Sequence, residues 1–498
     1  MNSARAFAAH PAPEQSGQRA PLLFFHLFSR SNCMRSLIVS FLIFVLTLLA
    51  PATHSSAAAQ ATMPKVWSNT HFLQLLMDVE AALARSQSSL GIIPKEAAEE
   101  ITRKAKVELL SQKELDEEQR RVGHPMVTLL NVWPRILEKN AGEFLHFGAT
   151  SMDIFDTAYI LQMRNSADII KSDLLAVEDM LLNLAEKHAD TPMMGRTLGR
   201  HALPITFGLK ISVWLAENRR HIDRLDDLKK RIQTGMVSGA VGSYAALGEK
   251  AFEVEKLTMK ELGLAEPELA DWKGARDRHA EYGFVLAGIA KTYGKIAQEL
   301  FILQTDEYGE VSENNPSVGS STMPHKQNPM RLTRVIAASR TVPAYAQMLA
   351  DWMVSIHERD QISNAATLKD ISLALDGMLG RMKSVFKDLG VFPDAMRRNM
   401  NRTNGLVMAE PLMFALGEKI GKHTAHEEVR LLAREAFAQK LSLKDAVLAK
   451  PELAKHFKPE ELDALLDPAK YTGKSAEVTR LVVSQIKALR AKEGLTQK

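Results

Sequence analysis

The stretch LAGIAKTYGKIAQELFIL, residues 286–303, decides the fold. Its apolar residues recur at alternating intervals of three and four positions, at Leu286, Ile289, Tyr293, Ile296, Leu300 and Leu303. This is the seam of a long helix that packs against other helices, in the same chain or in a partner chain.

Other segments carry the same helical period. Residues 77–94, MDVEAALARSQSSLGIIP, show an apolar stripe that ends at Gly91 and Pro94, and residues 205–232 show one apolar face. No run of alternating strand residues is convincing. We therefore predict an all-α fold, with a long-helix bundle core over residues 148–390 flanked by two smaller helical domains, residues 62–147 and 391–498.

Composition narrows the function classes. The chain has 498 residues, 24% of them charged and 46% hydrophobic, which excludes wholesale disorder. A formal net charge of +4 is small for this length, so a nucleic-acid partner is not indicated. The single cysteine, Cys33, excludes a disulfide framework and a cysteine-based metal centre, and we predict no metal and no cofactor.

Residues 1–61 are predicted to lie outside the fold. The apolar run LIVSFLIFVLTLLA, residues 37–50, follows Met34 and Arg35, and small residues suited to cleavage follow at Ala57–Ala61. We interpret residues 1–33 as an upstream extension and the next segment as a signal peptide. This predicts export to the periplasm or the medium, with no membrane contact after cleavage. An uncleaved anchor or a buried helix is the alternative.

Two polar clusters interrupt the helical patterns. The first, HFGATSMDIFDT at residues 146–157, offers Thr150 and Ser151 at the start of a helix, where hydroxyls suit a carboxylate or merely cap the helix. The second, GRTLGRHALP at residues 195–204, places Pro204 where a helix would start. Its arginines suit carboxylates, although exposed arginines and structural histidines are common.

The third cluster, GSSTMPHKQNP at residues 319–329, combines small hydroxyl residues, a lysine and an asparagine between prolines. That composition predicts a loop able to close over an anionic substrate. The loop resembles the GSSxMPxKxNP loop of the fumarase/aspartase superfamily, and the other two clusters resemble conserved regions of the same superfamily. The resemblance extends from about Val66 to the C-terminus.

The resemblance implies a homotetramer in which each active site is built from three subunits. It also implies removal of a proton beside a carboxylate, which gives an aci-carboxylate, and then loss of a group from the β carbon. Its substrate would be a small carboxylate anion. On this basis the catalytic candidates are Ser320 as the base, with Ser321 as its possible substitute, together with Lys326 and His201. The substrate-binding candidates are His124, His146, Thr150, Ser151, Arg196, Thr197, Asn328 and Arg359.

Two positions depart from the pattern that many members share. Leu198 stands where they have a histidine acting as general acid, and Thr333 stands where they have the glutamate that supports it. Leucine cannot protonate a departing amine. The 3-carboxy-cis,cis-muconate cycloisomerases are similar in this respect, and we therefore predict a cycloisomerase acting on a small polycarboxylate.

Other residues resemble the adenylosuccinate lyases. These are His124 and the stretch His357–Asp360, although Asn364 and Leu368 replace residues that hold a nucleotide phosphate there. The alternative is accordingly a C–N lyase that releases fumarate from an N-succinyl compound, with His201 or His124 as another acid. A catalytically silent binding protein is the third hypothesis, against which Ser320, Lys326 and Asn328 argue.

Overall fold

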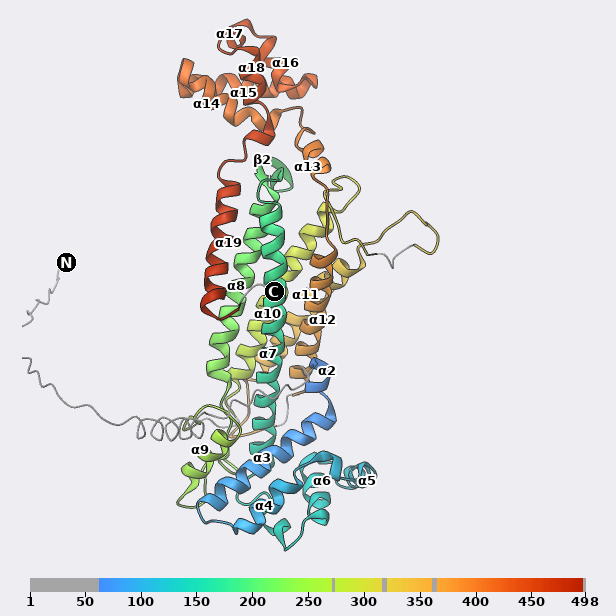
Figure 1. The fold of residues 1–498 in the computed structure, drawn as a ribbon, viewed down its shortest axis with the longest axis vertical. Coiled ribbons are helices and arrows are strands. Elements are labelled where there is room, and N and C mark those ends of the chain that lie inside the picture. The colour runs from blue at the N-terminus through green and yellow to red at the C-terminus, as the bar shows by residue number, and fades with distance from the viewer. Residues whose placement is uncertain (1–61, 271–273, 316–319, 361–364, 496–498) are drawn as a thin grey trace, which may run out of the picture. The chain divides into compact units, whose positions relative to one another are not determined.

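The computed structural model describes residues 62–270, 274–315, 320–360 and 365–495, all within one compact unit that spans Ala61–Lys498 (Figure 1). The predicted extension and signal peptide, residues 1–61, lie outside the described residues. Within the described ranges, no helix is both long enough and apolar enough to cross a bilayer.

The described part of the chain begins, at residue 62, with a group of mostly short helices. The predicted stripe of residues 77–94 lies on α3, where Met77, Val79, Ala82 and Leu83 are at most 1% exposed. The Ser68 hydroxyl caps this helix by accepting the His71 N–H at 3.2 Å. The elements are α2 (Met63–Val66), α3 (Asn69–Ser89), α4 (Lys95–Lys104), α5 (Gln112–Val122) and α6 (Pro125–Val132), with single turns at Val107–Leu109, Trp133–Ile136 and Ala141–Phe144.

Long helices form the central bundle. The seam predicted on residues 286–303 lies on α10, and each of its six residues is at most 1% exposed. Helix α10 packs against α8, α11 and α12, so the seam and the predicted fold class are confirmed. The bundle elements are α7 (Ser151–Lys187), α8 (Phe207–Ile232), α10 (Asp277–Leu303), α11 (Met330–Asp351) and α12 (Ala366–Asp388), with the shorter α9 (Ala251–Glu261) beside α3.

The second polar cluster is a β-hairpin, not the start of a helix. Strands β1 (Pro192–Thr197) and β2 (Arg200–Thr206) pair around a turn at Leu198 and Gly199, whose φ angles are 51° and 74°. Pro204 pairs with Met194 inside β2, and α8 begins only at Phe207. The sequence showed no convincing strands, so this hairpin was not predicted, and the expected helix start at Pro204 was wrong. The hairpin turn is hard to recognise from the sequence because leucine seldom takes the positive φ that this turn requires. A second short pair joins β3 (Val311–Ser312) to β4 (Gly390–Val391).

The C-terminal helices surround a small hydrophobic cluster of their own. They are α13 (Pro393–Met400), α14 (Ala409–Ile420), α15 (Lys422–Gln439), α16 (Leu443–Leu448), α17 (Pro451–Ala454) and α18 (Pro459–Leu465), with turns at Leu406–Met408 and Pro468–Lys470. The last helix, α19 (Ser475–Lys492), returns to the bundle and packs against α7 and α8 (Figure 1). Residues 391–498, predicted as a C-terminal helical domain, thus include both this cluster and a helix that packs on the bundle.

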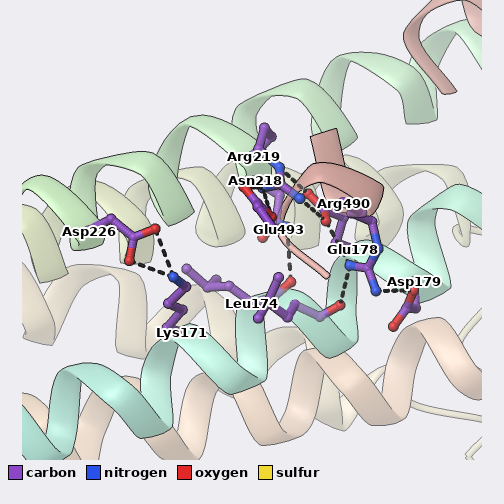
Figure 2. A network of polar contacts seen from close by, with 10 residues as sticks. Lys171, Leu174, Glu178, Asp179, Asn218, Arg219, Asp226, Arg490 and Glu493 are labelled. Atoms are coloured by element: carbon purple, nitrogen blue, oxygen red, sulfur yellow. Dashed lines mark hydrogen bonds and ion pairs between the residues drawn. The ribbon is translucent and has the colours of Figure 1, made fainter. Parts of the chain in front are cut away.

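A buried ion-pair network holds α19 in place (Figure 2). The Glu178 carboxylate on α7 is fully buried, and it accepts bonds from Arg219 of α8 and from Arg490 of α19, the latter at 2.8 Å. Arg219 also contacts Glu493 at 2.8 Å, and Arg490 contacts Asp179 at 2.7 Å. Loss of the Glu178 charge would leave the two buried guanidinium groups with only the more exposed carboxylates of Glu493 and Asp179 as partners.

We expect Glu178→Gln to lower the free energy of unfolding by about 3–5 kcal/mol, the typical cost of breaking a buried pair. Urea unfolding followed by circular dichroism measures the change. The matched control is Glu477→Gln on α19, whose contact with Lys474 is solvent-exposed and should contribute less than about 1 kcal/mol. Equal losses in the two variants would show that the network does not stabilise the bundle.

Candidate active site

The first polar cluster forms the N-terminal end of α7. Asp153, which is fully buried, accepts the N–H groups of Thr150 at 2.9 Å, Ser238 at 3.2 Å and Gly239 at 3.1 Å. The Asp153 carboxylate therefore joins the turn at Ser238 and Gly239, which follows α8, to the first turn of α7. Thr150 and Ser151 are half-buried at the N-terminal end of a helix, where the helix dipole favours an anion.

Gly148 explains how the chain enters that helix. Its φ is +74°, and a side-chain carbon at this position would lie 2.8 Å from Leu247 and 3.0 Å from the Ala246 carbonyl. The position therefore admits only glycine.

His146 is held from behind by a buried carboxylate. Its Nδ1 lies 2.6 Å from Oε1 of Glu80, its backbone N–H donates to Oε2 at 3.1 Å, and Glu80 is 1% exposed. Burial alone would lower the pKa of His146, but the hydrogen bond and charge of Glu80, with the charge of Asp153, outweigh it and raise that pKa above 6.5. The imidazolium form is thereby favoured, which suits a group that binds substrate carboxylates.

His124 lies at the same end of α7. Its Nδ1 accepts the Val127 N–H at 3.3 Å as the cap of α6, and its ring stacks on Phe155 of α7 with centroids 5.9 Å apart. In the neutral ring, Nε2 then carries the proton. The segment leading to Arg359 also comes here, since Arg276 stacks on Trp352 at the end of α11 and pairs with Asp156 of α7 at 3.1 Å. Arg359 itself is exposed.

The hairpin holds Arg196 in a structural contact. Its guanidinium makes two bonds to the fully buried Glu310, at 2.6 and 3.0 Å, and lies 4.5 Å from the centre of the Tyr308 ring. Asn399 of α13 donates to the same carboxylate at 2.8 Å. Arg196 therefore anchors the hairpin, and the guanidinium predicted to bind substrate is engaged by the protein.

The other hairpin residues divide by exposure. Thr197 and Leu198 are exposed, with Leu198 fully so at the tip. His201 is half-buried, and burial together with the charge of Arg196 lowers its pKa below 6.5. A neutral imidazole at pH 7 follows, which is the wrong form for a general acid.

The third cluster places Ser320 among backbone donors. Its Oγ accepts the N–H groups of Thr322 at 3.3 Å and Met323 at 3.1 Å. Two such donors stabilise negative charge on the oxygen, which a serine needs before it can act as a base. Ser320 and Asn328 are half-buried, whereas Ser321 and Lys326 are exposed.

Glu313 joins the two ends of this loop. Its buried carboxylate accepts the N–H groups of Arg331 at 3.1 Å and Leu332 at 3.0 Å, in the first turn of α11. The loop that carries Ser320 therefore starts and ends at one fixed point. Thr333 in the same turn donates its hydroxyl to the Met330 carbonyl at 3.0 Å.

The structure brings the candidates together in groups, not in one place. Helix α7 has 37 residues, a length of about 55 Å at 1.5 Å per residue. His124, His146, Thr150 and Ser151 lie at its start, whereas the hairpin with Thr197 and His201 follows its end. One chain cannot bring these two groups to the same substrate.

Sequence reasoning missed the carboxylates behind the clusters. Only Asp153 had a local signal, since Thr-x-x-Asp before a helix is a capping pattern. Glu80 and Glu310 reach their partners from 66 and 114 positions away, and no local pattern marks them. Within the described ranges, no group of three His, Cys, Asp or Glu residues could hold a metal ion.

We expect Glu80→Gln to lower the Tm most at low pH. Glu80 raises the pKa of His146 in the folded state. The contact between them therefore stabilises the fold fully below the unfolded-state pKa of His146, about 6.5, and this contribution is lost as the pH rises through the folded-state pKa. The Tm difference from the unaltered protein should therefore shrink as the pH rises above about 6.5. Calorimetry at several pH values measures it, with Glu427→Gln at the exposed His426 contact as control. A difference that grows with pH would refute the role of Glu80.

The chain is similar in sequence to known lyases. The family model described as Lyase matches residues 54–343, and the model described as Adenylosuccinate lyase C-terminus matches residues 405–482. The adenylosuccinate lyase of Methanocaldococcus jannaschii is 39% identical over 85% of this chain and 94% of its own length. The N-acetyl-S-(2-succino)cysteine lyase of Dickeya dadantii is 38% identical over 83% of this chain and 92% of its own.

A solved structure has the same fold. The 3-carboxy-cis,cis-muconate lactonizing enzyme of Pseudomonas putida superposes with a TM-score of 0.79 at 34% identity, covering 86% of this chain and 98% of that one. The helical bundle, the three polar clusters and these matches agree, and the chain belongs to the lyase family of the fumarase/aspartase superfamily.

Proposed function

We propose that this enzyme eliminates a substituent from a 2-succinyl conjugate and releases fumarate. The observation that carries the proposal is the pair of N–H groups on Ser320 Oγ, which prepares that oxygen to remove a proton. The relatives named adenylosuccinate lyase and N-acetyl-S-(2-succino)cysteine lyase support a lyase over the cycloisomerase predicted from the sequence. The lactonizing enzyme, at 34% identity, shares the fold.

The proposed reaction removes one proton from the substrate and moves two electron pairs. Ser320 first loses its own hydroxyl proton to solvent, and the resulting alkoxide, stabilised by the two backbone N–H groups, takes the proton from the carbon beside a carboxylate, while the electron pair of that C–H bond passes into the carboxylate. The electrons then return to form the carbon–carbon double bond, and the bond to the leaving group breaks. The carboxylates are held by Thr150, Ser151 and the cationic His146, with Lys326 and Asn328 supplied by the loop.

The proposed site requires several chains. Because α7 separates its own two ends by about 55 Å, the hairpin that completes one site comes from another subunit. The homotetramer expected for the superfamily provides such neighbours. Export of the chain, which depends on residues 34–61, remains a further proposal that the mass of the mature N-terminus tests.

The leaving group follows from the acid that the hairpin lacks. An amine leaves only with a proton, whereas a thiol leaves as a thiolate, since a free cysteine thiol has a pKa of about 8.5. Leu198 cannot supply a proton, and the lowered pKa of His201 keeps that residue neutral. A thioether conjugate therefore suits this chain better than an N-succinyl amine.

We expect Ser320→Ala to lower kcat for fumarate release by about 100-fold to 10,000-fold, the usual contribution of a general base. Ser321→Ala should stay within about tenfold of the unaltered enzyme, because the two backbone donors serve Ser320. Fumarate absorbance with S-(2-succino)cysteine gives both rates. A larger loss of kcat in Ser321→Ala than in Ser320→Ala would show that Ser321 is the base.

Mixing two inactive variants tests the shared site. Ser320→Ala subunits co-expressed with subunits carrying His146→Gln and Ser151→Ala should form hybrid assemblies with a fraction of unaltered sites. Activity should then return although each parent variant is inactive. Hybrids that form without activity would place all three clusters of a site in one chain.

The leaving-group proposal predicts a preference and a way to alter it. We expect S-(2-succino)cysteine to exceed the matching N-(2-succino) amine in kcat/KM. Leu198→His with Thr333→Glu should raise kcat/KM for the amine by about tenfold or more, since it supplies an acid and its partner. Leu198→Asn is the control, because asparagine fits the positive φ without an acid. Equal gains in kcat/KM for the amine in Leu198→His with Thr333→Glu and in Leu198→Asn would show that the gain comes from the changed hairpin turn and not from a new acid.

A further inference from the structure

A cavity of about 670 Å³ lies between the hairpin and the C-terminal helices. Strand β2 forms one wall, and the others come from the segment between α13 and α14, from α14 itself and from the end of α15. This volume is within the usual range of small-molecule sites. The residues that bind or deprotonate the substrate in the proposed function are not among its described lining residues. The cavity is therefore available to a different ligand.

Three cations line this cavity. Arg200 lies on β2, Arg402 follows α13, and Lys440 caps the end of α15. Within the described residues none of the three forms an ion pair with a carboxylate, and Arg402 donates to the Glu307 carbonyl. Cations that come from three elements and lack carboxylate partners favour an anion in the space between those elements.

One carboxylate, that of Glu410 on α14, lines the same cavity. Glu410 is exposed, and its carboxylate accepts the Tyr471 hydroxyl at 3.0 Å. The described lining thus carries more positive than negative charge. The excess favours a small anion over a cation or a neutral ligand.

Two polar atoms in the walls have no hydrogen-bond partner among the described residues. They are Nδ1 of His201 and Oγ1 of Thr403, and both atoms are buried. Both residues line the cavity. Buried polar atoms nearly always have a partner. A ligand with acceptor oxygens would give the Thr403 hydroxyl the acceptor that it lacks.

His201 is sensitive to the charge of this wall. Burial and the charge of Arg196 lower its pKa, the charge of Glu310 opposes them, and the charges of Arg402 and Arg200 lower the pKa further. An anion bound beside Arg200 and Arg402 would offset part of their charge and so raise the pKa of His201. Anion binding and protonation of His201 would therefore favour each other.

Apolar side chains form much of the remaining wall. They include Leu203, Leu406, Val407, Phe437 and Leu441. Phe437 is 71% exposed, so a ligand that covers its ring would remove apolar surface from water. An inorganic anion would leave this surface uncovered, whereas a hydrocarbon body would pack against it.

We propose that this cavity is a second ligand site, which binds an organic carboxylate with an apolar body. The carboxylate pairs with Arg200, Arg402 and Lys440, and the body packs against the apolar wall that includes Phe437. This site is additional to the one at Ser320, and its existence does not depend on the reaction proposed there.

Calorimetry on the full-length protein tests the class of ligand with three probes. Hexanoate has the charge and the apolar body, 1-hexanol has the body alone, and inorganic phosphate has the charge alone. We expect hexanoate to bind at least about tenfold more tightly than either of the others, since it alone gains from both walls. Absence of hexanoate binding, or equal binding of 1-hexanol or phosphate, would overturn the proposal.

Variants of the lining locate the bound hexanoate. Lys440→Gln should weaken it by about fivefold, as for loss of one partly exposed ion pair, and Phe437→Ala should weaken hexanoate more than acetate. The matched control is Lys419→Gln, an exposed lysine of α14 that does not line the cavity and should leave the Kd unchanged. Hexanoate that binds equally well to all three variants lies elsewhere, which would overturn the proposal.

Glu410→Gln gives a change of opposite sign. Glutamine can still accept the Tyr471 hydroxyl, but it removes the negative charge from the lining, so hexanoate should bind more tightly. Weaker binding would show that Glu410 attracts the ligand, and it would overturn the assignment of an anion.

The pH dependence of the Kd tests the contact with His201. Hexanoate stays ionised between pH 6 and pH 8, whereas His201 becomes protonated as the pH falls in this range or below it. Hexanoate should therefore bind more tightly at pH 6 than at pH 8, and His201→Gln should remove most of this difference. A Kd that is independent of pH in the unaltered protein would place the anion away from His201 and overturn the proposal.

Discussion

The length of α7 is the constraint on which the rest of the structure depends. A helix of 37 residues is a stiff rod of about 55 Å, and it places the carboxylate-binding cluster at one end and the hairpin at the other. The buried seam of α10 and the packing of α8, α11 and α12 support this rod. A chain built in this way distributes its chemical groups instead of collecting them, and this separation is why the proposed function uses a site shared between copies.

Each polar cluster is fixed from behind by a buried carboxylate. Glu80 holds His146, Asp153 holds the turn at Thr150, Glu310 holds Arg196, and Glu313 holds the base of the Ser320 loop. These carboxylates are at most 1% exposed. They satisfy the protein's own donors and cations, and in the proposed function the Ser151 hydroxyl and the outer nitrogen of His146 are then available to the substrate. Preorganised donors of this kind stabilise charge without reorganising during the reaction.

The sequence predicted what depends on local periodicity. The stripe on α3 and the seam on α10 are visible because their apolar residues recur within one helix. The hairpin was not visible, since a Leu-Gly turn with two positive φ angles contradicts the preference of leucine. Contacts such as Arg196 with Glu310 join residues 114 positions apart, and only tertiary packing brings them together. The candidate residues could be named from motifs, but their division between two ends of a helix could not.

The ion pairs of α19 join residues that are far apart in the sequence, so they form only after this late helix has been synthesised. During synthesis from the N-terminus, Glu178 and Arg219 emerge long before Arg490, which lies in the last helix. Until that helix arrives, the groove between α7 and α8 lacks both its apolar cover, Val483 and Ile486, and its second cation. A truncation before α19 would therefore remove the helix that closes the bundle over α7 and α8.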